Sequence, residues 1–370
     1  MTSKLMAGID LHGNNLFCGI VDGEGRRVLE KKLPCDLEQV LKTLQPFKKR
    51  LEKVAVESTY NWYWLVDGLR ENGYDTQLAN PAGIQQYNGL KHGDDKSDAL
   101  FLAELLRLKI LPTGYIYDAQ IRPVRDLLRR RMSLVQQRTS LMLSLKSLHV
   151  RTLGRNLGLR ELKKLEEQEA KKLFTHPANQ LIAGLQVRLI EQVGQSIGQI
   201  EKAVLKEIKP EPRYQVLQSL PGVGIILGMT IALETGEPGR FAAAGNYASY
   251  CRCVEAHRFS NEKKKGQNNR KCGNKYLAWA FVEAANFAKR YDLSCRRFFD
   301  RKAAQTNSIV ATKALACKLA KAAWHMMKEQ SPYDAGRIFP GSTGGSSPGT
   351  DLGRTAGKPD KGVGVKALRD

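Results

Sequence analysis

The sequence has too few acidic residues to balance its basic ones, and it contains no long hydrophobic run. It has 37 Asp and Glu against 59 Lys and Arg, which gives a formal net charge of +22 and a pI of about 9.7. No apolar stretch reaches the roughly 18 residues of a membrane span, and no signal peptide opens the chain. We therefore expect a cytoplasmic protein with no membrane partner. The positive charge favours nucleic acid over the competing partner, an anionic membrane surface, because each neutralised phosphate releases a counterion.

The cysteines offer neither a disulfide framework nor a zinc site. All seven are scattered along the chain, and only Cys251 and Cys253 lie close together. That pair lacks the spacing and the downstream partners of a zinc site. We interpret all seven as reduced thiols in a reducing compartment. A length of 370 residues is enough for two or three domains.

Residues 1–117 have the pattern of an α/β domain. Short apolar runs separated by turn residues predict strands, and apolar residues at helical spacing predict helices. The expected strands are 5–12, 16–21, 26–33, 53–57 and 74–78. The expected helices are 37–51, 61–71 and 95–108. Three hairpin strands followed by alternating helices and strands is the order of a ribonuclease-H-like domain.

Four carboxylates are expected to meet in this domain. Asp10 lies in the first strand, and Glu57 ends the strand at 53–57. Asp95 and Asp98 stand three residues apart, so on a helix they share one face. Converging acids repel one another, and hard divalent cations with oxygen ligands resolve that repulsion. Two such ions can activate an attacking oxygen and stabilise a leaving one.

Each acid also has a simpler interpretation. Asp10 can cap a strand end and face water, and Asp95 and Asp98 can interact with the dipole at a helix N-terminus. Asp94 lies four residues before Asp98 and is the alternative to Asp95 as a ligand. The set as a whole favours a metal site, because a buried carboxylate needs a compensating partner.

Residues 118–210 predict two long amphipathic helices. The first carries arginines between leucines, and the second, about 180–208, has apolar residues at nearly heptad spacing. We expect an antiparallel coiled-coil arm whose apolar seam can dimerise. Its predicted nucleic-acid-binding residues are Arg125, Arg129, Arg130, Arg131 and Arg138. The alternative is a plain helical hairpin with a solvated charged face.

Residues 211–335 predict a helical domain that opens with a turn like that of a helix-hairpin-helix. The turn is Leu220-Pro-Gly-Val-Gly224, directly before an apolar helix. Its glycines, Gly222 and Gly224, allow a close approach of the backbone, and free amides at a helix start suit a phosphate. Many turns of this kind are purely structural.

One serine in this region, Ser260, stands beside a run of cations. A serine hydroxyl is a weak nucleophile without a base or a metal, and cations stabilise a phosphoryl transition state. Ser260 is therefore a candidate for covalent attack on a DNA phosphate; the alternative is a polar loop residue beside a phosphate-binding cluster. The candidate phosphate-binding cations are Arg258, Lys263, Lys264, Lys265, Arg270, Lys271 and Lys275. The segment 336–370 is rich in Gly, Ser and Pro and is expected to be disordered.

Three motifs connect the chain to a known family. They are Asp95-Lys-Ser-Asp98-Ala99, Leu220-Pro-Gly-Val-Gly224, and Ser260-Asn-Glu-Lys-Lys-Lys-Gly266 with Gly273-Asn-Lys-Tyr276. From residue 5 to about 330 the chain resembles the DEDD transposases of bacterial insertion sequences, whose relatives include the Piv-type DNA invertases. Glu262 stands where that family usually has glycine.

The resemblance implies an α/β RuvC-like domain, a coiled-coil linker and a helical transposase domain. It implies that a tetrad binds magnesium, or manganese in its place: Asp10, Glu57, Asp95 and Asp98. It also implies that Ser260 attacks DNA and forms a transient phosphoserine link. The implied partners are a bridge or seeker noncoding RNA, donor and target double-stranded DNA, and further copies of the chain in a dimer and a tetramer. In that family, acids and serine from different subunits form composite sites.

Two other functions are compatible with these residues. One is a metal-dependent nuclease like a Holliday-junction resolvase, which forms no covalent intermediate and uses Ser260 only to bind phosphate. The other is a non-catalytic RNA-binding protein that has kept the fold. The basic segment around Ser260 argues against the first, and the complete set of acids argues against the second. A covalent adduct between protein and DNA would distinguish all three.

Overall fold

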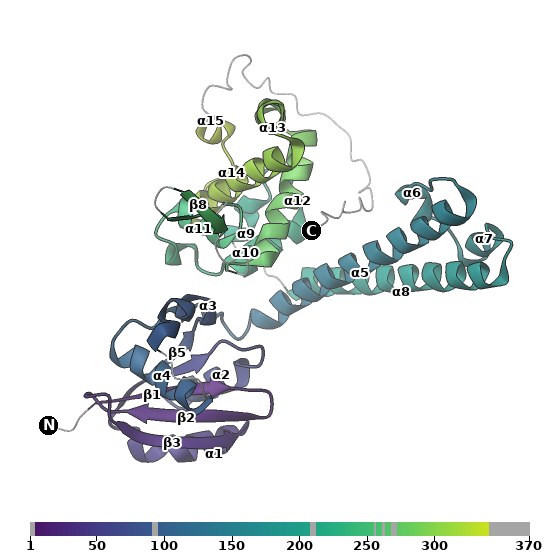
Figure 1. Cartoon of the computed structure of the whole chain (residues 1–370). Helices are drawn as coiled ribbons and strands as arrows, with labels where there is room; N and C mark the ends of the chain where they lie inside the picture. Colours follow the sequence, from purple (N-terminus) through teal and green to yellow (C-terminus); the bar gives the residue numbers. More distant parts are fainter. Residues whose placement is uncertain are drawn as a thin grey trace. The chain divides into compact units, whose positions relative to one another are not determined.

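The structure is a computed structural model in which the chain divides into two compact units, 1–120 and 121–370 (Figure 1). The described residues are 4–90, 95–207, 212–254, 257–260, 263–267 and 272–339. Within them, the backbone but not the side chains is described at 88–90, 95–97, 257–260 and 263–267. The expected boundary after residue 117 lies three residues before the division between the units. Among the described residues, no helix is both long enough and apolar enough to cross a membrane.

The first unit contains one mixed sheet. Its strands are β1 (Leu5–Leu11), β2 (Asn15–Val21), β3 (Arg27–Pro34), β4 (Leu51–Glu57), β5 (Thr76–Ala79) and β6 (Thr113–Gly114). They lie in the order β3-β2-β1-β4-β5-β6. The three hairpin strands pair antiparallel, whereas β4 pairs parallel with both β1 and β5. The predicted succession of three hairpin strands and then alternating helices and strands is therefore confirmed.

Helices cover both faces of this sheet. They are α1 (Leu37–Leu44), α2 (Tyr63–Glu71), α3 (Pro81–Ile84) and α4 (Asp95–Arg107), with 3-10 turns η1 (Gln45–Phe47) and η2 (Gln85–Leu90). Alternate residues of β1 pack with α1 and α2, whereas Met6 belongs to the core beneath α4. The predicted helix 37–51 was too long. It ends at Leu44 because Pro46, within η1, has no amide hydrogen to continue the helical bonds.

Helix α4 lies directly on the backbone of β1 and β2, where two glycines face it. Gly8 and Gly19 are register partners. A Cβ atom at Gly8 would come within 2.7 Å of the Ala103 nitrogen and closer still to the Ala99 carbonyl oxygen. A Cβ atom at Gly19 would come within 2.9 Å of the Leu100 nitrogen. Without side chains at these two positions, the helix can approach the sheet closely.

We expect Gly8→Ala to destabilise the first unit by about 1–3 kcal/mol, because the added methyl group collides with helix backbone that cannot rotate away. Gly114→Ala, on β6, is the matched control. Its added Cβ would only make ordinary contact with Leu78, so its effect should stay within about 0.5 kcal/mol. Denaturant unfolding of both variants measures the difference. Equal stabilities would show that α4 does not rest on Gly8.

The second unit begins with two long helices, α5 (Arg122–Leu153) and α8 (Pro177–Glu207), joined through α6 (Leu159–Leu162) and α7 (Glu167–Lys172). Val124, at the start of α5, packs in one cluster with Val204 near the end of α8. Leu148, near the end of α5, packs in another cluster with Val187. The two helices are therefore antiparallel and lie side by side as an arm, as predicted (Figure 1).

The remaining helices of the second unit surround one apolar core. They are α9 (Pro212–Leu217), α10 (Ile225–Thr235), α11 (Ala244–Tyr250), α12 (Lys275–Tyr291), α13 (Leu293–Gln305), α14 (Ser308–Glu329) and α15 (Ala335–Ile338), with a 3-10 turn η3 (Pro238–Arg240). Phe339 is buried in this core, and Lys318 donates to the Ile338 carbonyl. The disorder predicted from residue 336 is thus wrong for 336–339, because α15 and Phe339 pack on the core. The rest of that segment, 340–370, lies outside the described residues.

The basic segment around Ser260 forms a two-stranded hairpin, which the sequence did not predict. Its strands are β7 (His257–Ser260) and β8 (Lys263–Gln267), paired antiparallel, with Ser260 opposite Lys263. Ser260 is therefore the last residue of a strand and not a loop residue.

Candidate active site

Asp10 and Glu57 lie at adjacent strand ends on the same face of the sheet. In the parallel pair β1/β4, Gly8 is opposite Ala55 and Ile9 is opposite Val56, so Asp10 and Glu57 come next on the two strands. Because side chains alternate along a strand, both residues share the face of Gly8, against which α4 packs. Asp10 is 2% exposed and Glu57 is partly buried. The fold therefore brings together two of the four predicted acids.

The direction of α4 brings its acidic N-terminus to the same edge. Met6 shares a core cluster with Leu106, near the end of α4, and Gly8 lies against Ala99 and Ala103. Residues later in β1 therefore meet residues earlier in α4. Asp98 and Asp95 lie one and four residues before Ala99. Both are therefore in the first turn of α4, at the end of the helix that is nearer to Asp10. Asp98 is partly buried, whereas Asp95 is described by its backbone alone and Asp94 lies outside the described residues.

A histidine that the sequence did not single out lies beside Asp10. The Nε2 atom of His12 is 3.1 Å from Oδ2 of Asp10, and the His12 side chain is 40% exposed. The Asn61 amide donates to the His12 carbonyl at 3.0 Å, and the Thr59 hydroxyl donates to Oδ1 of Asn61. These bonds tie the segment after β4 to the end of β1. The sequence did contain a signal for this neighbour. His12 follows Asp10 by two positions, and in an extended chain two such side chains lie on the same face.

The chemistry of these residues suits a hard divalent cation. Carboxylate oxygens from two strand ends and one helix are the ligands that magnesium and manganese prefer. Among the side chains that the structure describes, no three of the His, Cys, Asp and Glu type lie close enough together to form a preformed metal site. Asp10, Glu57 and Asp98 are among those side chains and Asp95 is not, so it is the arrangement of the backbone elements that places the acids at one edge of the sheet.

The candidate nucleophile and its cations lie in the second unit, mostly on the hairpin. Arg258 and Ser260 are on β7, and the three lysines 263–265 are on β8. Lys275 is the first residue of α12, and its Nζ lies 5.2 Å from the centre of the Tyr276 ring. Arg270, Lys271 and Glu262 lie outside the described residues.

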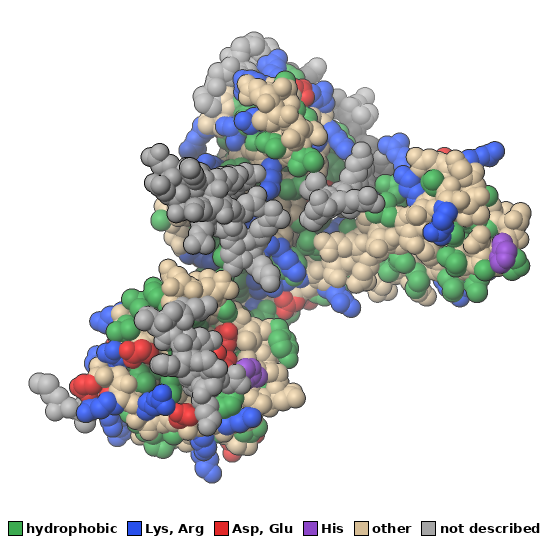
Figure 2. All heavy atoms as spheres, viewed as in Figure 1, with side chains coloured by type: hydrophobic (Ala, Val, Ile, Leu, Met, Phe, Trp, Pro, Cys, Tyr) green, Lys and Arg blue, Asp and Glu red, His purple; other side chains and the backbone are tan. Residues whose placement is uncertain are grey.

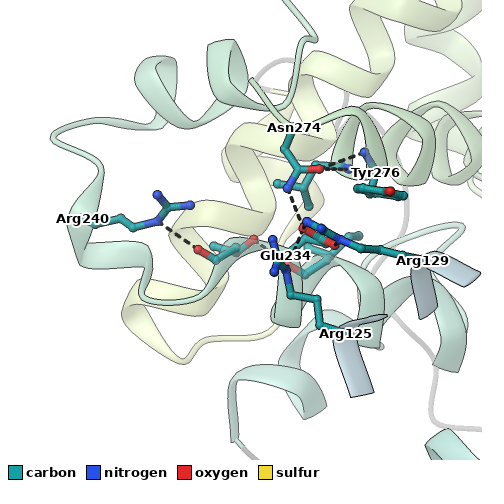
Figure 3. A network of polar contacts seen from close by, with 9 residues as sticks. Arg125, Arg129, Glu234, Arg240, Asn274 and Tyr276 are labelled. Carbon is teal, nitrogen blue, oxygen red and sulfur yellow. Dashed lines mark hydrogen bonds and ion pairs between the residues drawn. The ribbon is translucent and has the colours of Figure 1, made fainter. Parts of the chain in front are cut away.

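Two of the predicted nucleic-acid-binding arginines are instead paired with a buried carboxylate (Figure 3). Glu234, on α10, is 1% exposed. Its Oε2 accepts from Nε of Arg125 at 3.1 Å and from Nη2 of Arg129 at 2.9 Å. Asn274 donates to the same oxygen at 2.7 Å. Burial alone would raise the pKa of Glu234, but these partners outweigh burial and hold its pKa below the ordinary value.

The other three arginines of the predicted set on α5 differ from one another. Arg131 donates to Glu201 on α8 at 2.7 Å. Arg138 is partly buried, and desolvation together with the charge of Arg131 lowers its pKa. Arg130 is exposed. The expectation that the whole set faces a phosphate backbone is therefore wrong for Arg125, whose guanidinium is buried against Glu234. A lone acid in the apolar sequence of α10 was the signal for this pairing.

We expect Arg125→Gln to lower the free energy of unfolding by about 3 kcal/mol, because it removes one partner of a buried ion pair. Arg130→Gln is the matched comparison on the exposed side of α5. It should leave stability within about 0.5 kcal/mol and reduce the log–log salt slope of nucleic-acid binding by about 0.7–0.9. Denaturant unfolding and binding titrations at several salt concentrations measure both effects. An unchanged slope for Arg130→Gln would return α5 to the solvated-face alternative.

The glycine turn before α10 has a packing role. Gly222 has a φ of 79°, and a Cβ atom there would come within 2.7 Å of the Ala288 nitrogen on α12. A side chain at this position would therefore push the turn away from α12. Gly224 is exposed and is the N-cap of α10, and a Cβ atom there would meet no described atom within 4 Å. Close packing against α12 explains the glycine at position 222. Of the two glycines predicted to bind nucleic acid, Gly224 is the exposed one.

Both units match family models of one class of protein, the transposases. A DEDD transposase model of the IS110 group matches residues 7–152, which include all four acids. A second model, described as transposase IS116/IS110/IS902 family, matches residues 214–300, which include Ser260. The chain belongs to this family of insertion-sequence transposases.

Relatives from several bacteria agree with this assignment. The protein y4qE of Sinorhizobium fredii, named as a putative transposase, is 28% identical over 234 residues, which are 60% of this chain and 55% of that protein. The transposase for insertion sequence element IS1111A of Coxiella burnetii is 24% identical over 75% of this chain and 77% of its own length. The transposase for insertion sequence element IS1328 of Yersinia enterocolitica is 22% identical over 88% of this chain and 97% of its own length.

Proposed function

We propose that this chain is an RNA-guided DNA recombinase that cuts and rejoins DNA strands in transposition. Its acids Asp10, Glu57, Asp95 and Asp98 act in strand cleavage, and Ser260 forms the transient phosphoserine link. The observation that supports the proposal is that β1, β4 and α4, which carry these acids, converge on one edge of the mixed sheet in a member of a transposase family. The test is capture of a covalent adduct on a DNA substrate nicked near the junction, in the presence and absence of a chelator.

The chain's own residues would divide the work as follows. The carboxylates at the ends of β1 and β4 and at the start of α4 would hold magnesium or manganese. When bound, a divalent metal there would activate the attacking oxygen and neutralise charge on the phosphate. Ser260 would attack the DNA phosphate and release the 3′ or 5′ oxygen of the cut strand, so that the phosphodiester energy is kept for rejoining. The lysines of β8, beside Ser260 in the hairpin register, would offset the charge of the phosphoryl transition state.

The proposed partners are donor and target DNA, a noncoding guide RNA and further copies of the chain. A net charge of +22 supports nucleic acids as a class, and the guide RNA is what the resemblance to the family implies. Hydrophobic side chains gather on the arm, over α8 (Figure 2). Leu181, Leu185 and Leu189 are 59%, 45% and 45% exposed at a spacing of four residues, so they lie along one side of the helix. This exposed row supports a homo-oligomer in which the arms of two copies pair.

A further inference from the structure

The hairpin that carries Ser260 lies between α11 and α12 along the chain, and the described residues that flank it are 251–254 and 272–274. The outgoing segment follows α11 and contains Arg252. The returning segment contains Cys272, Gly273 and Asn274, directly before α12. The position of the hairpin therefore depends on how these two segments are joined.

The end of α11 has a residue type that its backbone disfavours. The amide of Arg252 donates to the Ser249 carbonyl, and the amide of Cys253 donates to the Ala248 carbonyl. These bonds form a Schellman motif with Arg252 in its left-handed position, at a φ of 54°. Glycine is the usual residue there, because a side chain is strained at positive φ. An arginine at this position calls for a reason outside the helix itself.

The side chain of Arg252 supplies that reason. Its Nε donates to the Cys272 carbonyl and its Nη2 to the Gly273 carbonyl, each at 3.0 Å. The planar guanidinium thus binds two successive carbonyl groups of the returning segment. The Asn274 amide in turn donates to the Tyr250 carbonyl at 2.6 Å. Gly273 has no room for a side chain, since a Cβ atom would lie 2.5 Å from that same Tyr250 oxygen.

The returning segment is also fixed to the core. Oδ1 of Asn274 accepts from the amides of Tyr276 and Leu277 and so caps α12. Nδ2 of Asn274 donates to Glu234, which holds Arg125 and Arg129 of α5, and Arg129 lies over the Tyr276 ring at 4.4 Å (Figure 3). Asn274 is 7% exposed. Arg252 therefore ties the outgoing segment to an anchored one.

We propose that Arg252 is a positioning residue, whose guanidinium closes the base of the β7–β8 hairpin and thereby holds Ser260 in place for attack. The role of Ser260 rests on the function proposed above, whereas the closed base rests on the contacts between residues 250–252 and 272–274. Two backbone carbonyl groups as acceptors explain why arginine is used, because a lysine ammonium cannot present two parallel N–H groups to them.

Arg252→Gly separates positioning from stability. Glycine relieves the strain at positive φ while it removes the two bonds, so the melting temperature should change little. Hydrogen exchange of the hairpin amides in 257–267 should become at least about tenfold faster. Adduct formation on the nicked DNA should slow by about tenfold to 10²-fold at saturating DNA, because a small misplacement of a reacting group is costly. DNA affinity should stay within about twofold. Arg252→Lys should recover only part of the rate.

Gln330→Gly is the matched control. Gln330 ends α14 in the same left-handed conformation, at a φ of 51°, in the same unit. Its substitution should raise the melting temperature and leave both hairpin exchange and adduct formation unchanged. Unchanged hairpin exchange in Arg252→Gly would overturn the closed base. Faster exchange with an unchanged adduct rate would overturn the positioning role. If the unaltered chain formed no adduct, Ser260 would lose its proposed role, and hairpin exchange would still decide whether Arg252 closes the base.

Discussion

Ser260→Ala is expected to abolish the covalent adduct between the protein and a DNA substrate nicked near the junction. The phosphoserine link requires the serine oxygen, so no residual adduct should form. Folding should be preserved, because the loss of one hydroxyl at a strand end removes little stability. If the hydroxyl only bound a phosphate, its loss would cost about 1 kcal/mol, or several-fold in rate. The two hypotheses therefore differ by orders of magnitude in residual strand exchange, measured with labelled DNA on denaturing gels.

Ser249→Ala is the matched control, because Ser249 is an exposed serine of α11 in the same unit. It should form the adduct at the normal rate. Efficient strand exchange by Ser260→Ala, or an adduct that maps to another residue, would favour a resolvase-like nuclease instead.

Asp10→Asn and Asp98→Asn are each expected to abolish strand cleavage and to leave nucleic-acid binding nearly unchanged. Each change removes a negative charge and a proposed metal ligand from the edge where β1, β4 and α4 meet, whereas the cations of the second unit stay in place. The loss should be at least about 10³-fold, since a metal that neutralises charge in the transition state contributes several kcal/mol. Cleavage assays with magnesium, with manganese and with excess chelator measure it, together with binding titrations.

Glu71→Gln is the control for the acids. Glu71 ends α2, is exposed, and lies outside the set of four. It should cleave at the normal rate. Undiminished cleavage by either Asp variant, or cleavage in excess chelator, would remove the metal role of the tetrad.

The positions of Asp10 and Glu57 at strand ends could be predicted from the sequence because their signals are local. Asp10 interrupts an apolar strand, and Glu57 ends another. Alternation along parallel strands then gives their shared face. The approach of α4 is not local. It depends on Gly8 and Gly19 being register partners on different strands, which only the paired sheet brings together beneath the helix.

The hairpin was missed for a reason of composition. Its second strand begins Lys263-Lys-Lys, and lysine has a low preference for strands, so the cations hid the pairing. In the sequence, residues 273–276 are recognisable only as a motif. The contacts of the returning segment with Arg252 and Glu234 could not be predicted, because those residues lie 20 and 40 positions away.

The sequence by itself predicted the α/β and helical parts of the chain and singled out the four acids, from residue types and from periods of two and 3.6 along the chain. The class of protein came from the resemblance of three motifs to a known family. Tertiary structure alone decided what the charges do. Arg125 and Arg130 are both cations of one helix, but Arg125 faces Glu234 and is buried, whereas Arg130 faces outward. The local sequence around the two arginines is of the same kind, so it does not distinguish them. Glu234 is 109 residues from Arg125 along the chain, and only folding brings the two together. Once Arg125 is buried, the cost of desolvating its charge makes that pairing necessary.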